Sequence, residues 1–228
     1  MKNIKTRIHR EGRNPLLIIT LIIFLLNLGI YIFVSSHWIL ACTLCLSAIV
    51  LVFVAYFFRS PSREFKIDDP DFIVAPADGK VVVIEETDES EFFHEPRLQV
   101  SIFMSPFNVH ANWYPVEGVV LKSDHQKGRH QAAWLPKSSI ENERSLVVIE
   151  TTSKLQVAVR QIAGAMARRI VTYAKKGDQV GRNEYMGFIK LGSRVDMYLP
   201  LDTEIFVEIG DTVQGNSTII GRLNNPNK

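Results

Sequence analysis

Gly192 and Ser193 form the step in this chain whose residue types could do chemistry on the backbone itself. A serine hydroxyl that follows a glycine can attack the preceding carbonyl, because glycine leaves that carbonyl approachable and adjacency in the chain supplies proximity. The attack would cut the backbone and leave an ester. The dipeptide alone is uninformative, since about one Gly-Ser pair is expected by chance in this length. A bulge or tight corner is the structural alternative, so the accompanying motifs must decide.

Two other segments place titratable side chains beside predicted strands. Asp78 lies in the segment Ala75–Lys80, where Asp-Gly is also an ordinary hairpin-turn pair. His110 follows the apolar run Val100–Met104 and is either a proton carrier that titrates near neutral pH or a buried core histidine. The other five histidines show no spacing typical of metal ligands. The sequence therefore predicts no metal site.

Several motifs, taken in their order and spacing, resemble the phosphatidylserine decarboxylases of the short, membrane-associated type. They are Ala75–Gly79, Ser105–His110, Asn142–Arg144, Gln161–Gly164 with Ala167–Arg169, and Gly187–Arg194. The joint pattern, rather than any one motif, makes the resemblance specific. It covers most of Phe72–Leu223, whereas the N-terminal segment matches in kind rather than in residues.

The resemblance implies a proenzyme that cleaves itself between Gly192 and Ser193. Ser193 would become a pyruvoyl group, a covalent cofactor at the start of the 36-residue C-terminal piece. The family's processing residues map to Asp78, His110 and Ser193, with His110 taking the hydroxyl proton and Asp78 orienting the histidine. The implied activity is that of a carboxy-lyase, which converts phosphatidylserine to phosphatidylethanolamine and carbon dioxide in phospholipid biosynthesis. The ketone would accept the electrons released, and His110 would protonate the product carbon.

One position departs from the longer relatives, which carry a second histidine three residues after the first. Trp113 stands there in this chain, and the sequence leaves open what replaces that imidazole. Residues that bind the substrate are unknown. Arg168, Arg169 and Arg194 could meet the lipid phosphate, although a solvated surface role is the more ordinary interpretation.

Short β-type runs must position these residues, and turn residues separate them. The predicted strands are Phe72–Val74, Lys80–Glu85, Leu98–Met104, Val116–Ser123, Ser145–Glu150, Leu155–Ile162, Phe188–Leu191, Arg194–Leu199, Glu204–Ile209 and Thr218–Leu223. One helix is expected near Ala163–Tyr173, where apolar residues recur at helical spacing. The turn Gly210–Gly215 is typical of barrel-sandwich domains. The predicted class is mainly β with minor helix, barrel-sandwich-like, preceded by a transmembrane hairpin.

The stretch from Asn14 to Phe58 contains no Asp, Glu, Lys or Arg. Its two apolar runs, Pro15–Val34 and Trp38–Phe58, have 20 and 21 residues, and about 20 helical residues cross a bilayer core. A signal peptide fits poorly, because a second span follows almost at once. Basic residues precede the first span and follow the second, whereas the turn between the two spans is uncharged. The positive-inside rule then places both ends in the cytoplasm.

The organisation expected is a basic N-terminus with a transmembrane hairpin over 1–58, and a β-rich catalytic domain over 59–228 on the cytoplasmic face of the cell membrane. Both cysteines, Cys42 and Cys45, fall in the apolar stretch, where small packing residues are a better interpretation than a redox pair. The net charge is +2 and becomes close to neutral without the N-terminal segment, so no basic face for nucleic acid is indicated.

The partners expected are a membrane phospholipid and the two self-cleaved chains with each other, and homo-oligomer formation stays open. Two other functions compete with self-cleavage. A serine hydrolase could use the same three residues in an intact chain, although no G-x-S-x-G elbow is present. A membrane-anchored binding module without activity would also stay intact.

Overall fold

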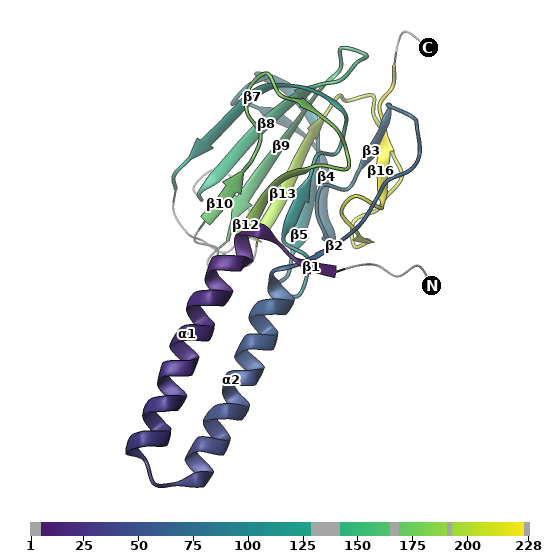
Figure 1. Cartoon of the computed structure of the whole chain (residues 1–228). Helices are drawn as coiled ribbons and strands as arrows, with labels where there is room; N and C mark the ends of the chain where they lie inside the picture. The colour runs from purple at the N-terminus through teal and green to yellow at the C-terminus, as the bar shows by residue number, and fades with distance from the viewer. Residues whose placement is uncertain (1–5, 129–141, 165–168, 191–192, 226–228) are drawn as a thin grey trace. The chain divides into compact units, whose positions relative to one another are not determined.

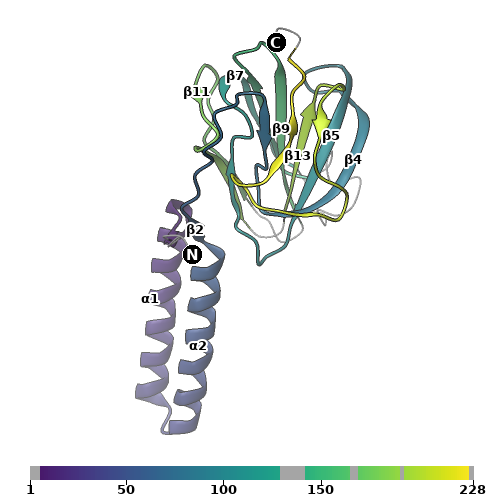
Figure 2. The ribbon, with the colours of Figure 1, turned by 90° about the vertical axis from the view of Figure 1, so that its right-hand side faces the viewer.

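A computed structural model describes residues 6–128, 142–164, 169–190 and 193–225. Its residues form two compact units, Met1–Ser62 and Arg63–Lys228. The first unit is a helical hairpin made of α1 (Arg10–Phe33) and α2 (His37–Phe57) (Figures 1 and 2). Short strands β1 (Thr6–Ile8) and β2 (Arg59–Pro61) pair antiparallel at its ends. Both helices are long and apolar enough to cross a membrane.

A buried amide links the two helices of the hairpin. The Asn27 side-chain amide donates to Ser47 Oγ at 2.9 Å and to the Ile23 carbonyl at 2.8 Å. Gly12 allows a close approach, because a Cβ there would lie 2.4 Å from Phe58 Cβ. Interhelical hydrogen bonds and small residues are the usual means of packing helices in lipid, and most large apolar side chains of the hairpin are exposed.

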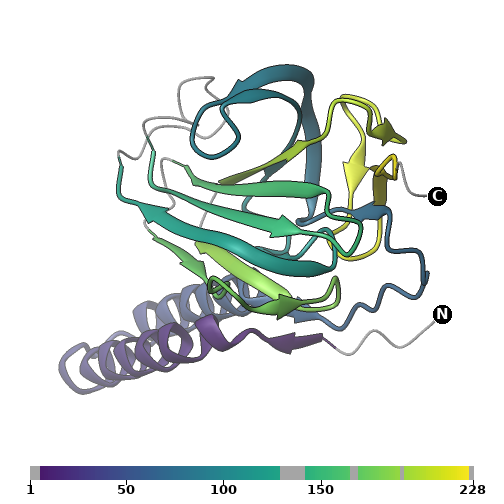
Figure 3. The same ribbon diagram turned by 90° about the horizontal axis from the view of Figure 1, so that it is seen from above.

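The second unit is mainly β, as predicted. Its largest sheet has eight strands in the order β11-β7-β8-β9-β13-β5-β4-β15 and is visibly curled (Figure 3). These strands are β4 (Gly79–Glu89), β5 (Glu95–Met104), β7 (Gly118–Gln126), β8 (Arg144–Glu150), β9 (Gln156–Ala163), β11 (Gln179–Val180), β13 (Ser193–Leu199) and β15 (Thr212–Val213). All the pairings are antiparallel.

Two three-stranded sheets complete this unit, in the orders β10-β12-β6 and β14-β16-β3. Their strands are β3 (Phe72–Val74), β6 (Ala111–Trp113), β10 (Arg169–Thr172), β12 (Tyr185–Lys190), β14 (Glu204–Ile205) and β16 (Ile219–Arg222). Figure 1 shows β3 beside β16, which joins the beginning of this unit to its C-terminal strands.

Strand β13 lies in the middle of the large sheet and is buried along its whole length. Because successive side chains of a strand face opposite sides, Val195, Met197 and Leu199 enter the main apolar core, whereas Tyr198 enters a smaller cluster. Ser193 lies two residues before Val195 and therefore on the same face of the strand. The fold therefore turns the Ser193 side chain toward the main core.

Two local expectations are corrected by the structure. The helix expected near Ala163–Tyr173 is wrong for the described residues, because β9 continues to Ala163 and residues 169–172 form β10, which pairs with β12. The hairpin-turn alternative at Asp78-Gly79 is also wrong. Strand β3 pairs with β16 whereas β4 pairs with β5, so Asp78 lies where the chain passes from one sheet to another.

Glu89, at the end of β4, is a buried carboxylate with four donors. The backbone N–H groups of Glu91, Phe92 and Phe93 donate to it at 3.0, 2.8 and 2.8 Å, and Arg160 Nη2 donates at 3.0 Å. Burial raises the pKa of Glu89, but these N–H donors and the Arg160 charge outweigh it and hold the pKa below its ordinary value.

We expect Glu89→Gln to lower the free energy of unfolding at pH 7 by about 2 kcal/mol, because buried Arg160 loses its 3.0 Å contact with the Glu89 carboxylate and keeps the longer, 3.4 Å contact with Glu91. A depressed folded-state pKa adds stability above the ordinary value of 4.5, and this stability is lost as the pH falls through the folded-state pKa. The free energies of unfolding of wild type and variant, measured by denaturant titration from pH 7 to pH 3, should therefore converge in acid. The exposed Glu86→Gln is the control, and curves that stay parallel would contradict the assignment.

Candidate functional site

Ser193 begins β13 and is paired with Met104 of β5 on one side and Ala163 of β9 on the other. Its side chain has no exposed surface, and its Oγ donates to Met104 Sδ at 3.2 Å. A thioether is a weak acceptor, so this contact holds the hydroxyl only loosely. Gly192, the other half of the predicted cleavage site, lies outside the described residues.

His110 lies between β5 and β6 and is fully buried. Its Nδ1 is 2.9 Å from the Asn108 carbonyl, which can only accept, so Nδ1 carries the proton and Nε2 is the basic nitrogen. The His110 carbonyl accepts from Ile189 N–H at 3.2 Å, and the imidazole and Phe188 ring centroids are 6.5 Å apart. His110 is thus tied to β12, the strand that precedes Ser193 in the chain.

Asp78 is largely buried, and its described hydrogen bonds run to Arg63 and Gly215. The Gly215 N–H donates to Asp78 Oδ1 at 2.8 Å, and the Arg63 guanidinium binds both carboxylate oxygens, with Nη2 2.9 Å from Oδ2. Arg63 also donates to the Gly215 carbonyl at 2.9 Å. Since the Asn108 carbonyl sets the tautomer of His110, the orienting role of Asp78 stays a prediction.

Trp113, at the position of the second histidine in longer relatives, packs against the same cation. Its ring lies 5.5 Å from Arg63 Cζ and 5.2 Å from the Tyr185 ring. Gly215 permits this packing, because a Cβ there would lie 2.7 Å from the indole. The sequence alone did not indicate that Arg63 belongs to the site, because a basic residue that follows an apolar span is usually interpreted as a charge at the membrane surface.

Two buried amides, Gln161 and Asn112, were also missed as site residues. Gln161 Nε2 donates to Asn112 Oδ1 at 2.7 Å, and Asn112 Nδ2 lies 3.7 Å from Met104 Sδ. The pair therefore ends on the thioether that accepts from Ser193. Gln161 belongs to a motif that carries the resemblance, but its partner comes from another sheet, which no local pattern indicates.

The arginines considered for the lipid phosphate lie in different environments. Arg194 is buried and binds both oxygens of Asp196, at 2.8 and 3.0 Å. Arg169 is exposed on β10. Arg168 lies outside the described residues. The Arg194 guanidinium is therefore already engaged with a carboxylate inside the protein.

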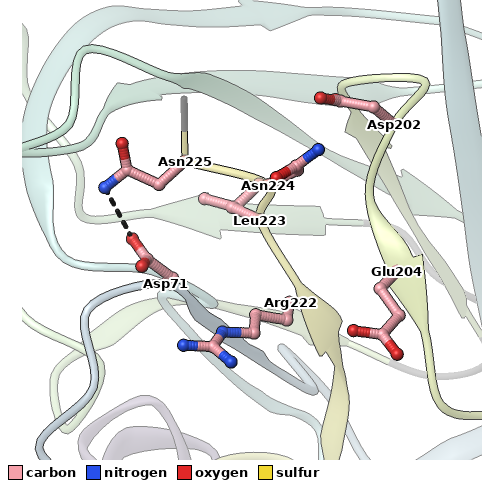
Figure 4. Close-up of a pocket in the computed structure, with 7 residues that line it drawn as sticks. All are labelled: Asp71, Asp202, Glu204, Arg222, Leu223, Asn224 and Asn225. Atoms are coloured by element: carbon pink, nitrogen blue, oxygen red, sulfur yellow. Dashed lines mark hydrogen bonds between the residues drawn. The ribbon is translucent and has the colours of Figure 1, made fainter. Parts of the chain in front are cut away.

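A pocket of about 400 Å³ lies elsewhere on this unit (Figure 4). It is lined by Asp71, Asp202, Glu204, Arg222, Leu223, Asn224 and Asn225. Three carboxylates would repel an anionic headgroup, and Asp78, His110 and Ser193 are not among the described residues that line it. This pocket is therefore a poor site for the predicted chemistry.

Comparisons with a family model and with known proteins point to the same family. The phosphatidylserine decarboxylase family model matches residues 50–221. A phosphatidylserine decarboxylase proenzyme of Bacteroides fragilis is 52% identical over 219 residues, 96% of each chain. Proenzymes of the same name from Cytophaga hutchinsonii and Amoebophilus asiaticus are 49% and 42% identical, over 95% of this chain and 98% and 96% of theirs.

Proposed function

The chain belongs to the phosphatidylserine decarboxylase family, and we propose that it cuts itself between Gly192 and Ser193 to make the pyruvoyl group with which it decarboxylates phosphatidylserine. The observation that carries the proposal is the placement of Ser193. Its hydroxyl directly follows the cleavage position, yet it is sealed in the core, and the acceptor it finds among the described residues is a thioether. A serine hydroxyl becomes an effective nucleophile when a base takes its proton, which is the role proposed for His110.

Self-cleavage is an acyl transfer within the chain. Ser193 Oγ attacks the Gly192 carbonyl, His110 takes the hydroxyl proton at Nε2, and the peptide nitrogen leaves as the amine of residue 193. Asp78 supplies negative charge that stabilises the imidazolium, and Arg63 and Gly215 fix that carboxylate. The resulting ester eliminates more readily than an amide, which releases the Gly192 carboxylate and leaves dehydroalanine at residue 193. Hydrolysis of dehydroalanine then gives the ketone and releases the nitrogen as ammonia.

The surroundings of Ser193 suit the group it would become. Ladders to β5 and β9 on both sides would hold residue 193 rigidly after the preceding bond is cut. A pyruvoyl group at residue 193 would supply an electron sink for the pair released with carbon dioxide. His110 is the proposed acid that returns a proton to carbon.

The substrate explains an anchored enzyme. A diacyl lipid leaves the bilayer reluctantly, because each buried methylene contributes about 0.8 kcal/mol. We place the hairpin of residues 1–58 in the cell membrane and the catalytic domain of residues 59–228 on the cytoplasmic face, as the basic flanks favour. The proposed partners are the membrane phospholipid and the two cleaved chains with each other.

The mass of freshly made wild-type protein under denaturing conditions tests the proposal. We expect a 192-residue and a 36-residue piece, the shorter lacking a free amino group and reacting with borohydride and hydroxylamine. An intact chain labelled by a fluorophosphonate would favour a serine hydrolase. An intact, unlabelled chain without decarboxylase activity would favour a binding module.

A further inference from the structure

The buried amides beside Ser193 form a chain with a defined direction. Ser145 Oγ and Thr172 Oγ1 donate to Gln161 Oε1 at 2.7 and 3.0 Å. The Gln161 NH₂ group therefore faces Asn112 Oδ1, at 2.7 Å. Since Asn112 Oδ1 is the acceptor, its own NH₂ group is turned toward Met104 Sδ. Two hydroxyls thus set the orientation of a donor two side chains away.

The surrounding backbone restricts this arrangement further. Gln161 and Asn112 have no exposed surface, and β12 packs directly on the Gln161 amide. A Cβ at Gly187 would lie 2.7 Å from Gln161 Nε2. The amide therefore has little room to reorganise, which is a property of a preorganised donor.

Met104 Sδ is the point where this chain meets the nucleophile. Ser193 Oγ lies 3.2 Å from the sulfur and Asn112 Nδ2 lies 3.7 Å from it. Two buried donors converge on one weak acceptor, although a buried polar group normally finds a full hydrogen-bond partner. A core that needed only packing would place apolar side chains here. The poor resting acceptor suggests that a better one forms during the reaction.

We propose that Asn112, oriented by Gln161, donates a hydrogen bond to the Ser193 oxygen when the ester formed in self-cleavage breaks down; this rests on the proposed function. In that step a base removes the Cα proton of residue 193 and the Cβ–Oγ bond breaks. The electron pair goes to Oγ, which departs as part of the Gly192 carboxylate. A donor is stronger toward this anion than toward a thioether, so it favours the transition state over the resting state. Gln161 is a positioning residue.

Two substitutions remove the donor by different routes. Asn112→Asp keeps the acceptor for Gln161 but turns an oxygen toward Met104 and Ser193. Gln161→Glu keeps the acceptor for Ser145 and Thr172 but presents an oxygen to Asn112. Asn112 must then turn its NH₂ group toward residue 161 and away from Met104 and Ser193. We expect each to slow the appearance of the blocked 36-residue piece by about 100-fold, as for loss of one preorganised donor. Because both act on one hydrogen bond, the double variant should be no slower than either single variant.

The ester itself is the decisive readout. The chains are made by cell-free synthesis, quenched at intervals and treated with neutral hydroxylamine, which splits an ester to give a 36-residue piece with a free amino-terminal serine. We expect this piece to accumulate in both variants and not in wild type. The control is Gln99→Glu, which alters another buried amide whose partner is Ser101 Oγ and should process at the wild-type rate. Unfolding midpoints are compared in a Ser193→Ala background, where every chain is intact.

The outcomes are distinct. Processing of both variants within threefold of wild type overturns the proposal, as does slow processing without accumulated ester, which would mean that attack rather than elimination is impaired. If Asn112→Asp does not fold, Gln161→Glu decides, since it leaves Asn112 in place. An uncleaved wild-type chain would instead contradict the proposed function.

Discussion

Ser193→Ala is expected to abolish self-cleavage and decarboxylation together, leaving an intact 228-residue chain. The substitution removes the attacking oxygen, which is also the atom that must leave Cβ before the ketone can form, so no partial route remains. The fold should persist, because alanine fits the same buried position and the side-chain hydrogen bond lost among the described residues is the weak one to Met104 Sδ. Denaturing mass spectrometry and conversion of phosphatidylserine in mixed micelles measure the two losses.

Ser101→Ala is the matched control for that experiment. Ser101 is another fully buried serine, on the neighbouring strand β5, and its hydroxyl accepts from Gln99. We expect this variant to cleave itself and to decarboxylate its substrate. Cleavage before residue 193 in Ser193→Ala would show that another group attacks the backbone, and the proposed mechanism would have to be abandoned.

Asp78→Asn is expected to slow self-cleavage by about 100-fold, the scale on which one electrostatic contact to a developing charge acts. The charge that stabilises the His110 imidazolium would be lost, and the Arg63 guanidinium would keep its place without a counter-ion. Cleavage half-times in pulse-labelled chains measure the effect.

Arg63→Gln tests whether Asp78 stabilises the His110 imidazolium or merely holds Arg63 in place, because this variant keeps the carboxylate and removes the cation. We expect a much smaller loss than for Asp78→Asn. The double variant should regain stability, since neutralising a buried pair costs less than breaking it, but it should still fail to cleave. Equal rates for the two single variants would mean that Asp78 only holds Arg63 in place.

Local sequence patterns predicted most of the sheet because alternation and turn residues report on each strand separately. Strand β3 was predicted residue for residue, and β13 within one residue of its start. The segment after Ala163 failed because its helical spacing is a local signal, whereas pairing of β10 with β12 is a tertiary one that overrides it. Ile170 is buried by that pairing rather than by a helix face.

The candidate site was predictable only where one residue carries the chemistry. Ser193 and His110 follow from their types and motifs, and the structure buries both. Arg63 and Asn112 are recognisable only through their partners, Asp78 and Gln161, which lie 15 and 49 positions away. Such long-range pairs depend on how distant segments of the chain meet in the fold, and no local sequence pattern indicates where they meet.

The placement of β13 has a consequence for the lifetime of the mature protein. The proposed cut removes the covalent link before a strand that stays clasped between β5 and β9, while β15 and β16 remain paired with β4 and β3. Folding is completed as one molecule, but renaturation afterwards would need two molecules to find each other. Once the cleaved protein has unfolded in dilute solution, it should thus not refold. Its lifetime would be set by its rate of unfolding rather than by its free energy of unfolding.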